Sequence, residues 1–313
     1  MGKKPLIILT GPTAVGKTKL SIALAKAIGG EIISADSVQV YKHMDIGSAK
    51  ITPEEMQGIT HYLVDVLEPT CDFHVVKFQE MAKEAMEKIY ANGHIPILVG
   101  GTGFYIQAVL NDIDFTKNEE DSACRKELEE FVKIKGAHAL HEMLRSIDEK
   151  AAEEIHENNV KRVIRAIEFY KQSGQKISEH NEEQRAKVSP YAFKYFVLND
   201  DREKLYANID KRVDIMVRDG LLEEVKKLLL MGCKRDSTAM QGIGYKEILD
   251  YLDGETTFEE AVGAIKSNTR HFAKRQLTWF RREKDVIWVD KDKFAYNDQM
   301  MLEYIVECCK DIL

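Results

Sequence analysis

LIILTGPTAVGKT, residues 6–18, is the stretch that decides the fold. Residues 6–9 are an apolar run that predicts a buried strand, and a helical pattern resumes at Leu20. Between them lies a G-x-x-x-x-G-K-T motif, residues 11–18. Its glycines let the chain wrap with backbone N–H groups inward, and the next helix directs the positive end of its dipole to the same point. The pattern predicts a polyphosphate-binding loop; a chance match in an ordinary strand-turn-helix is the alternative.

Two side chains of this loop can act on the bound group directly. Lys17 brings a positive charge to a phosphate, and the hydroxyl of Thr18 can reach a bound Mg²⁺. The motif alone does not say which polyphosphate binds, or whether the phosphate is transferred or merely departs.

The composition predicts a soluble globular protein of one or two domains. Of 313 residues, 44% are hydrophobic and 31% charged. No apolar run approaches the roughly 18 residues of a membrane span, and residues 1–5 are too few and too polar for a signal peptide. The five cysteines show no C-x-x-C pair and no histidine at zinc spacing, so we expect reduced thiols in a cytoplasm. The net charge of −7 argues against indiscriminate coating of nucleic acid but allows a local basic face.

A second predicted strand, residues 31–36 (EIISAD), ends in Asp36. Functional groups collect at the carboxyl ends of parallel strands, so we expect Asp36 beside the phosphate loop. A carboxylate there can hold Mg²⁺ or accept a proton from a nucleophile. The alternative is an aspartate that caps the following turn.

Residues 61–67 and 95–99 are further strand candidates, separated by a helix over residues 77–90. The strand at 95–99 runs into GGTGFY, residues 100–105. In many phosphate-loop ATPases the corresponding strand ends in an aspartate that organises Mg²⁺. Gly-Gly-Thr at this place predicts that something bulky approaches the backbone, and it weighs against a nucleotide-hydrolysing motor or switch.

The composition changes after about residue 110. Residues 114–188 are dense in Glu, Lys and His with helical periodicity, and strands resume later. The predicted helices and strands of this part cover residues 122–135, 138–147, 151–157 and 160–172, then 193–198 and 286–289. We therefore predict an α/β fold with a P-loop NTPase-like parallel sheet core, residues 1–113 and 189–313, interrupted by a helical insertion domain, residues 114–188.

Two basic segments suggest a nucleic-acid interface. The helix over 160–172 places Lys161 and Arg165 one turn apart with Arg162 beside them, although a basic helix face alone is usually just solvated. In residues 269–284 (TRHFAKRQLTWFRREK), cationic side chains interleave with rings such as Trp279. Such a mixture suits a splayed single-stranded RNA loop, while a core helix with buried aromatics is the alternative.

Two more segments complete the candidate site. In a helix predicted over residues 208–225, Arg212 could reach back to the phosphate loop and steady a departing phosphate; a surface ion pair is the alternative. In residues 240–247 (MQGIGYKE), two glycines beside Gln241 and Tyr245 suggest a close backbone approach to a ligand, although a plain turn explains them nearly as well.

Taken in order, six segments resemble the bacterial tRNA dimethylallyltransferases, also called tRNA isopentenyltransferases. They are GPTAVGKT (11–18), ISADSVQVYKHMDIGSAK (33–50), GGTGFY (100–105), NNVKRVIRAIE (158–168), QGIGYKE (241–247) and AKRQLTWFRR (273–282). The resemblance spans residues 5 to about 288, and the combination is far more specific than the phosphate loop alone.

The resemblance implies transfer of a dimethylallyl group from dimethylallyl diphosphate to N6 of the adenosine at tRNA position 37, 3′ of the anticodon, with release of diphosphate. It also implies Mg²⁺ as cofactor, an insert that grips the anticodon stem-loop, and a cytoplasmic enzyme with no membrane association and no obligate protein partner. The chemistry fits: charge builds on the leaving diphosphate, the adenine amine needs a proton acceptor such as Asp36, and the base must leave its stack.

By motif matching, the resemblance implies three sets of residues. The catalytic set is Asp36, Thr18, Lys17 and Arg212, with Thr18 as metal ligand. The diphosphate-binding set is Gly11, Pro12, Thr13, Ala14, Val15, Gly16, Lys17 and Thr18. The tRNA-binding set is Asp36, Ser37, Val38, Gln39, Thr102, Arg125, Lys161, Arg162, Val163, Ile164, Arg165, Gln241, Gly242, Ile243, Gly244, Tyr245, Lys246, Lys274, Arg275, Gln276, Leu277, Thr278, Trp279, Phe280 and Arg281.

Three other functions compete with this hypothesis. A small-molecule phosphate-loop kinase would leave the basic and aromatic segment unexplained. A non-catalytic RNA-binding module would not need the intact phosphate loop or Asp36. Prenyl transfer to free AMP would leave the helical insert and the basic segments without a role.

Overall fold

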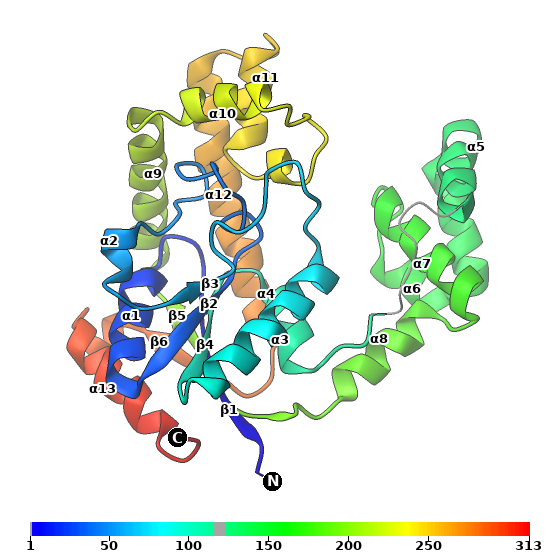
Figure 1. Ribbon diagram of the computed structural model, residues 1–313. Helices are drawn as coiled ribbons and strands as arrows, with labels where there is room; N and C mark the ends of the chain where they lie inside the picture. Colours follow the sequence, from blue (N-terminus) through cyan, green and yellow to red (C-terminus); the bar gives the residue numbers. More distant parts are fainter. Residues whose placement is uncertain (1, 116–122) are drawn as a thin grey trace. The chain divides into compact units, whose positions relative to one another are not determined.

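The computed structural model describes residues 2–115 and 123–313, which form two compact units (Figure 1). The first unit comprises the chain up to Leu110 together with Pro190–Leu313, and the second comprises Asn111–Ser189. In the described residues, no helix has both the length and the apolar character needed to cross a membrane.

The first unit is built on a six-stranded parallel sheet. Its strands, in the spatial order β3-β2-β4-β1-β5-β6, are β1 (Lys4–Thr10), β2 (Gly30–Ala35), β3 (His61–Tyr62), β4 (Ile95–Gly100), β5 (Tyr191–Asn199) and β6 (Val286–Asp290). The predicted α/β fold with a parallel sheet is confirmed. Because β1 lies in the middle of the sheet and precedes the phosphate loop, that loop emerges at the centre of the carboxyl edge.

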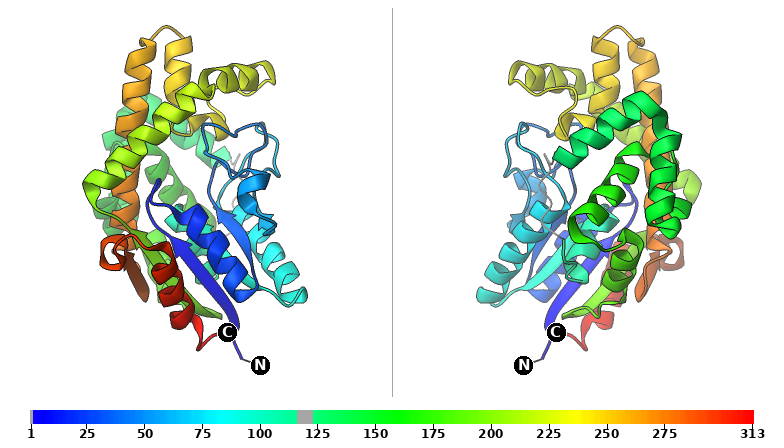
Figure 2. Two further views of the ribbon diagram at one scale, coloured as in Figure 1. Left: turned by 90° about the vertical axis from the view of Figure 1, so that its left-hand side faces the viewer. Right: turned by 90° about the vertical axis from the view of Figure 1, so that its right-hand side faces the viewer.

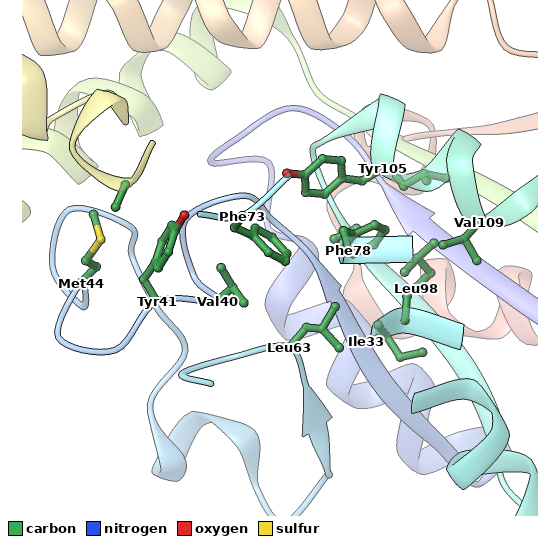
Figure 3. Close-up of a cluster of buried hydrophobic side chains, with 14 of the residues drawn as sticks. Ile33, Val40, Tyr41, Met44, Leu63, Phe73, Phe78, Leu98, Tyr105 and Val109 are labelled. Carbon is green, nitrogen blue, oxygen red and sulfur yellow. The ribbon is translucent and has the colours of Figure 1, made fainter. Parts of the chain in front are cut away.

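Helices cover both faces of the sheet, which explains why its strands read as continuous apolar runs. One face packs against α1 (Lys17–Ile28) and α13 (Asp298–Cys309), and the other against α3 (Val75–Ala91) and α4 (Gly103–Leu110) (Figure 2). Alternate residues of β1 point to the two faces. Ile7 and Leu9 belong to the hydrophobic cluster on the side of α1 and α13, and Leu6 and Ile8 belong to the cluster on the side of α3 and α4. Figure 3 shows the cluster on the side of α3 and α4, where aromatic rings from these two helices pack against the sheet.

The remaining elements of this unit are helices between and after the strands. They are α2 (Pro53–Met56), α9 (Arg202–Arg218), α10 (Leu221–Leu230), η1 (Ala239–Gln241), α11 (Tyr245–Leu252), α12 (Phe258–Phe280) and η2 (Lys291–Phe294). A capping box at Thr257 starts α12 well before the predicted basic segment. The single helix predicted over residues 208–225 was wrong: the chain breaks at Gly220, whose φ of 104° lies outside the helical region, and continues as α10.

Strand β3 is shorter than predicted. Leu63 and Asp65 have φ angles of 61° and 59°, which are left-handed and incompatible with an extended ladder. Only His61 and Tyr62 therefore pair with β2, and residues 65–67 hydrogen-bond to residues 39 and 40 instead.

The regular elements among the described residues of the second unit are all helices. It contains α5 (Ala123–Ile147), α6 (Glu149–Glu154), α7 (Val160–Ser173) and α8 (Ile177–Ala186), around a core that includes Leu140 and Ile167. Gly136 has non-helical angles inside α5, so the two helices predicted on either side of it are present; residue 122 lies outside the described residues. Helix α8 was not predicted, and Asp148 joins it to α6 by accepting hydrogen bonds from Ala151 N and from the backbone and hydroxyl of Ser178.

Candidate active site

The loop between β1 and α1 has the backbone geometry of a phosphate cradle. Gly11, Ala14 and Gly16 have φ angles of 145°, 63° and 99°, so three of the six residues 11–16 have a positive φ. A Cβ on Gly11 would lie 2.3 Å from the carbonyl oxygen of Leu198, and only glycine fits there. Helix α1 begins at Lys17 without a side-chain cap, which leaves its first N–H groups open to a ligand.

Lys17 lies over the cradle with its charge poorly stabilised. Its Nζ donates to the carbonyl oxygens of Gly11 at 2.9 Å and Pro12 at 2.7 Å. Burial, and then the positive charge of Arg212, lower the pKa of Lys17 to about 7, while Asp36 acts in the opposite direction. A bound anion would restore the full charge of Lys17.

A cavity of about 120 Å³ adjoins the cradle and brings the predicted catalytic side chains together. It lies within the first unit. Lys17, Thr18, Asp36 and Arg212 all line it, and the other lining residues are Thr13, Ala14, Gly16, Ser21, Ile32, Ser34, Gln39, Ser48, Ala49, Ile51, His61, Val64, Val99, Gly100, Gly101, Phe272 and Gln276.

Arg212 reaches the cradle from α9, 3.5 Å from Nη1 to the hydroxyl of Thr13. Burial lowers the pKa of Arg212 from its ordinary value, while Asp36 and Glu55 raise it. An arginine keeps its charge under such conditions because its ordinary pKa is so high. The cavity therefore holds one permanent cation in addition to Lys17.

Asp36 caps a turn and also lines the cavity. Its Oδ1 accepts the N–H groups of Val38 at 2.8 Å and Gln39 at 3.2 Å, so the side chain does cap the turn after β2. Within residues 2–115 and 123–313, its Oδ2 accepts no hydrogen bond. The turn fixes the carboxylate and leaves its second oxygen open to the cavity that it lines.

The bulky group predicted next to the Gly-Gly-Thr turn is α12 itself. A Cβ on Gly101 would lie 2.1 Å from Gln276 Nε2, and one on Gly103 would lie 2.2 Å from Trp279 Cδ1. The amide of Gln276 spans the site, donating to Gly101 O and accepting from Thr13 N, both at 2.9 Å. A neutral amide therefore joins the phosphate loop to the end of β4.

The predicted tRNA-binding residues of the first unit divide by exposure. On α12, Lys274, Arg275 and Thr278 are exposed together with the following Arg281, and a shallow groove lies over Lys274, Arg275, Thr278 and the partly buried Trp279. Gln241 is exposed, and Ser37, Val38, Gln39, Thr102, Gly242, Ile243, Lys246 and Leu277 are partly buried.

Three side chains of that set are largely buried. Tyr245 and Phe280 lie fully in the core, whereas Gln276, 6% exposed, lines the cavity and is hydrogen-bonded to the cradle. Gly244 is also buried, at the N-cap of α11. Side chains on the inner face of an amphipathic helix cannot reach a ligand outside it, and motif matching names whole segments without separating their faces.

In the second unit the same division holds along α7. Lys161 and Arg162 are exposed and Arg165 is partly buried, whereas the side chains of Val163 and Ile164 are buried in the helical core. Arg125 forms an ion pair of 3.3 Å with the buried Glu168 of α7. Its guanidinium is thus held within its own unit.

Lys291, at the carboxyl end of β6, was missed by the sequence analysis. Its Nζ donates to Val15 O of the phosphate loop at 3.3 Å and forms an ion pair with the buried Asp200, also at 3.3 Å. The rule that selected Asp36, a charged residue directly after a parallel strand, also applies to Lys291 and could have found it.

The protein is an α/β protein with a parallel sheet. One cavity combines a phosphate loop, a carboxylate and two cations, and a helix presents a cationic surface, an arrangement suited to a polyphosphate and an anionic polymer. Comparison with known protein families identifies the family of this chain. The profile of the IPP transferase family (IPPT) matches residues 39–283, and the chain belongs to that family.

Relatives that align with nearly the whole chain support this family membership. A tRNA dimethylallyltransferase from Lachnoclostridium phytofermentans is 62% identical over 302 residues, 96% of each chain. The structure is similar to a crystal structure of the full-length tRNA isopentenylpyrophosphate transferase from Bacillus halodurans, with 45% identity, a TM-score of 0.74 and coverage of 99% of this chain and 98% of that one. It is also similar to a eukaryotic dimethylallyltransferase crystallised acting on tRNA, with 30% identity, a TM-score of 0.79 and coverage of 92% and 74%.

Proposed function

We propose that this enzyme transfers the dimethylallyl group of dimethylallyl diphosphate to N6 of the adenosine at position 37 of tRNA, in the cytoplasm. One observation carries the proposal: a single cavity is lined by the phosphate loop, two cations and a carboxylate. The C1–O bond of the allylic diphosphate breaks with its electron pair going to diphosphate, N6 forms a bond to C1, and one proton leaves N6.

The cradle, residues 11–18, binds the diphosphate through its backbone N–H groups and Lys17. Negative charge grows on the leaving diphosphate as the C1–O bond lengthens, and Lys17 and Arg212 stabilise that charge. Both side chains line the cavity, and after burial the charge of Arg212 is the next cause of the lowered pKa of Lys17. A diphosphate between them relieves this repulsion.

Two oxygen-bearing side chains next to the cradle support the proposed use of Mg²⁺. Thr18 is exposed at the start of α1 and lines the same cavity as the Asp36 carboxylate, and hard oxygen donors with phosphate oxygens are what Mg²⁺ prefers. Thr18 would hold the ion directly. When bound, the ion supplies further positive charge to the leaving group.

Asp36 accepts the proton that N6 loses. The capped turn at Val38 and Gln39 fixes its carboxylate, and Oδ2 has no competing donor among the described residues. A general base must hold its proton-accepting oxygen where the substrate can reach it, and Asp36 lines the cavity. The adenine reaches such a pocket only after leaving its stack.

The exposed cations hold the tRNA. These are Lys274 and Arg275 on α12 and Arg281 directly after it, beside Trp279 and Thr278, a combination of charges for phosphates and a ring for stacking. In the helical insert, Lys161 and Arg162 form an exposed basic pair on α7, which we assign to the anticodon stem-loop.

The decisive experiment incubates the purified protein with Mg²⁺, labelled dimethylallyl diphosphate and an anticodon stem-loop carrying A37. We expect one prenyl group per stem-loop and one diphosphate released, with no reaction for a stem-loop carrying G37. ATP and AMP serve as control substrates. Phosphoryl transfer from ATP without prenylated RNA would refute the proposal, and prenylated AMP with unmodified RNA would redirect it to the free nucleotide.

A further inference from the structure

Glu224 is a buried carboxylate with no place in the mechanism above. It lies in the first turns of α10, is 9% exposed, and does not line the cavity. A buried carboxylate is unfavourable unless hydrogen bonds stabilise its charge. Such a residue therefore needs an explanation.

Its partners are consecutive backbone groups of one loop. Oε2 accepts the N–H of Asp45 at 2.8 Å and of Ile46 at 2.7 Å, and Oε1 accepts the N–H of Gly47 at 3.0 Å. The hydroxyl of Tyr245 donates to Oε1 at 2.8 Å. Four donors fill the acceptor sites of one carboxylate, and hydrogen bonds to an ionised acceptor are the strong ones.

The ring of Tyr245 also lies against the loop. Burial, and then the Glu224 charge, raise the pKa of Tyr245 well above its ordinary value, so its hydroxyl keeps its proton and acts as a donor. A Cβ on Gly47 would lie 2.5 Å from Tyr245 Cζ, so only glycine fits at that position. The loop is held by its backbone against a rigid ring.

The held loop leads directly to the proton acceptor. Ser48 and Ala49, which follow Gly47, line the cavity, and their carbonyl oxygens accept Gln39 Nε2 at 3.3 and 3.2 Å. The N–H of Gln39 in turn closes the Asp36 turn at 3.2 Å. Hydrogen bonds therefore connect Glu224, through the loop backbone and Gln39, to Asp36.

At its other end, this chain of hydrogen bonds begins on α10, the helix next to the one that carries Arg212. Helix α10 follows α9 after the break at Gly220, so Glu224 lies twelve residues beyond Arg212 on a neighbouring helix. We propose that Glu224 is a positioning residue. Its four hydrogen bonds fix the loop at residues 45–49 relative to the junction of α9 and α10 at Gly220. Through Gln39, the same bonds fix the Asp36 carboxylate. This role rests on the proposed function of Asp36.

The test compares Glu224→Gln with Glu223→Gln. Both changes remove one negative charge from adjacent positions of α10, but Glu223 is exposed. In Glu224→Gln an amide NH₂ faces the N–H of Gly47 or those of Asp45 and Ile46, so part of the anchor is lost. Small displacements of a catalytic group can cost up to about 100-fold in rate, so we expect kcat to fall by about 10- to 100-fold with KM for dimethylallyl diphosphate unchanged. Glu223→Gln should match the wild type.

A second measurement does not depend on catalysis. Hydrogen exchange of the amides of Asp45, Ile46 and Gly47 should accelerate at least about tenfold in Glu224→Gln and stay unchanged in Glu223→Gln. Unchanged exchange would overturn the proposal, as would a kcat equal to that of the wild type, or a rise in KM for the diphosphate with kcat intact. A wild-type enzyme that prenylates no RNA would instead refute the proposed function, and exchange would still report on the anchor.

If Glu224→Gln does not fold, the variant Tyr245→Phe tests the positioning role of Glu224 instead. It removes one of the four donors and leaves the three backbone donors in place, so we expect a fall in kcat of about threefold and faster exchange at Gly47. An unchanged kcat together with unchanged exchange in Tyr245→Phe would overturn the proposal.

Discussion

Raising the pH from 7 to 9 should weaken the binding of dimethylallyl diphosphate by about 50-fold through Lys17 alone. The free enzyme holds this lysine at a pKa of about 7, because burial and the neighbouring Arg212 destabilise its charge. About half of the molecules carry the proton at pH 7 and about one in a hundred at pH 9. An anion beside the ammonium group favours the charged form, so the bound enzyme keeps the proton across this range.

The sign follows from proton linkage. The complex binds more protons than the free enzyme between pH 7 and the raised pKa of the bound lysine, so binding takes up protons and weakens as the pH rises. At pH 8 the uptake should be close to one proton per site. Calorimetry with an unreactive diphosphate ester, in buffers with different protonation enthalpies and at fixed Mg²⁺, measures this number directly.

Two variants separate Lys17 from other titrating groups. Lys17→Met should bind the ester more weakly at pH 7 and show no uptake beyond that of the ligand itself. Lys19→Met is the matched control, because Lys19 is exposed and Asp298 raises its pKa, so it stays charged throughout. If Lys17→Met kept the pH dependence of the wild type, Lys17 would not be the titrating group and the account of the cradle would be wrong.

Three more outcomes are expected. Asp36→Asn should lower the rate of prenyl transfer by about 10²- to 10⁴-fold with tRNA affinity nearly unchanged; a loss of affinity alone, measured by filter binding, would contradict its role as base. Arg275→Gln should weaken tRNA binding and reduce the slope of log K against log salt by about one, and an unchanged slope would remove α12 from the RNA interface. Gly103→Ala should destabilise the fold by about 1–3 kcal/mol in urea unfolding, because its Cβ would lie 2.2 Å from Trp279. Gly263→Ala, in open space on α12, is the control and should not destabilise.

The sheet and the cradle were predictable because their signals are local. Residues 6–18 contain strand, turn and helix start in one continuous motif, and Asp36 directly follows its strand. Whether Arg212 reaches the cradle was left open by the sequence, since a surface ion pair fitted equally well; the structure places it 3.5 Å from Thr13.

Interactions between distant segments were not predictable in the same way. Gln276 pairs with Thr13 across 263 residues, and Glu224 with the N–H groups of Asp45–Gly47 across nearly 180. Neither pairing has a local pattern, since any glutamine or glutamate on an amphipathic helix looks alike in sequence. The sequence motifs also did not distinguish the buried from the exposed face of a helix, because they include Val163 and Phe280 together with their exposed neighbours.

The end of β4 explains why a phosphate loop can serve carbon transfer rather than phosphate transfer. Where many phosphate-loop ATPases carry an aspartate that organises Mg²⁺ and water, this chain has Gly100 and Gly101, and the amide of Gln276 fills the space. Asp36 is then the single carboxylate among the described residues that line the cavity, facing two cations. In the proposed reaction, this balance would favour stabilising a departing diphosphate over activating water against phosphorus, and the one carboxylate would be left to take the proton from the incoming amine.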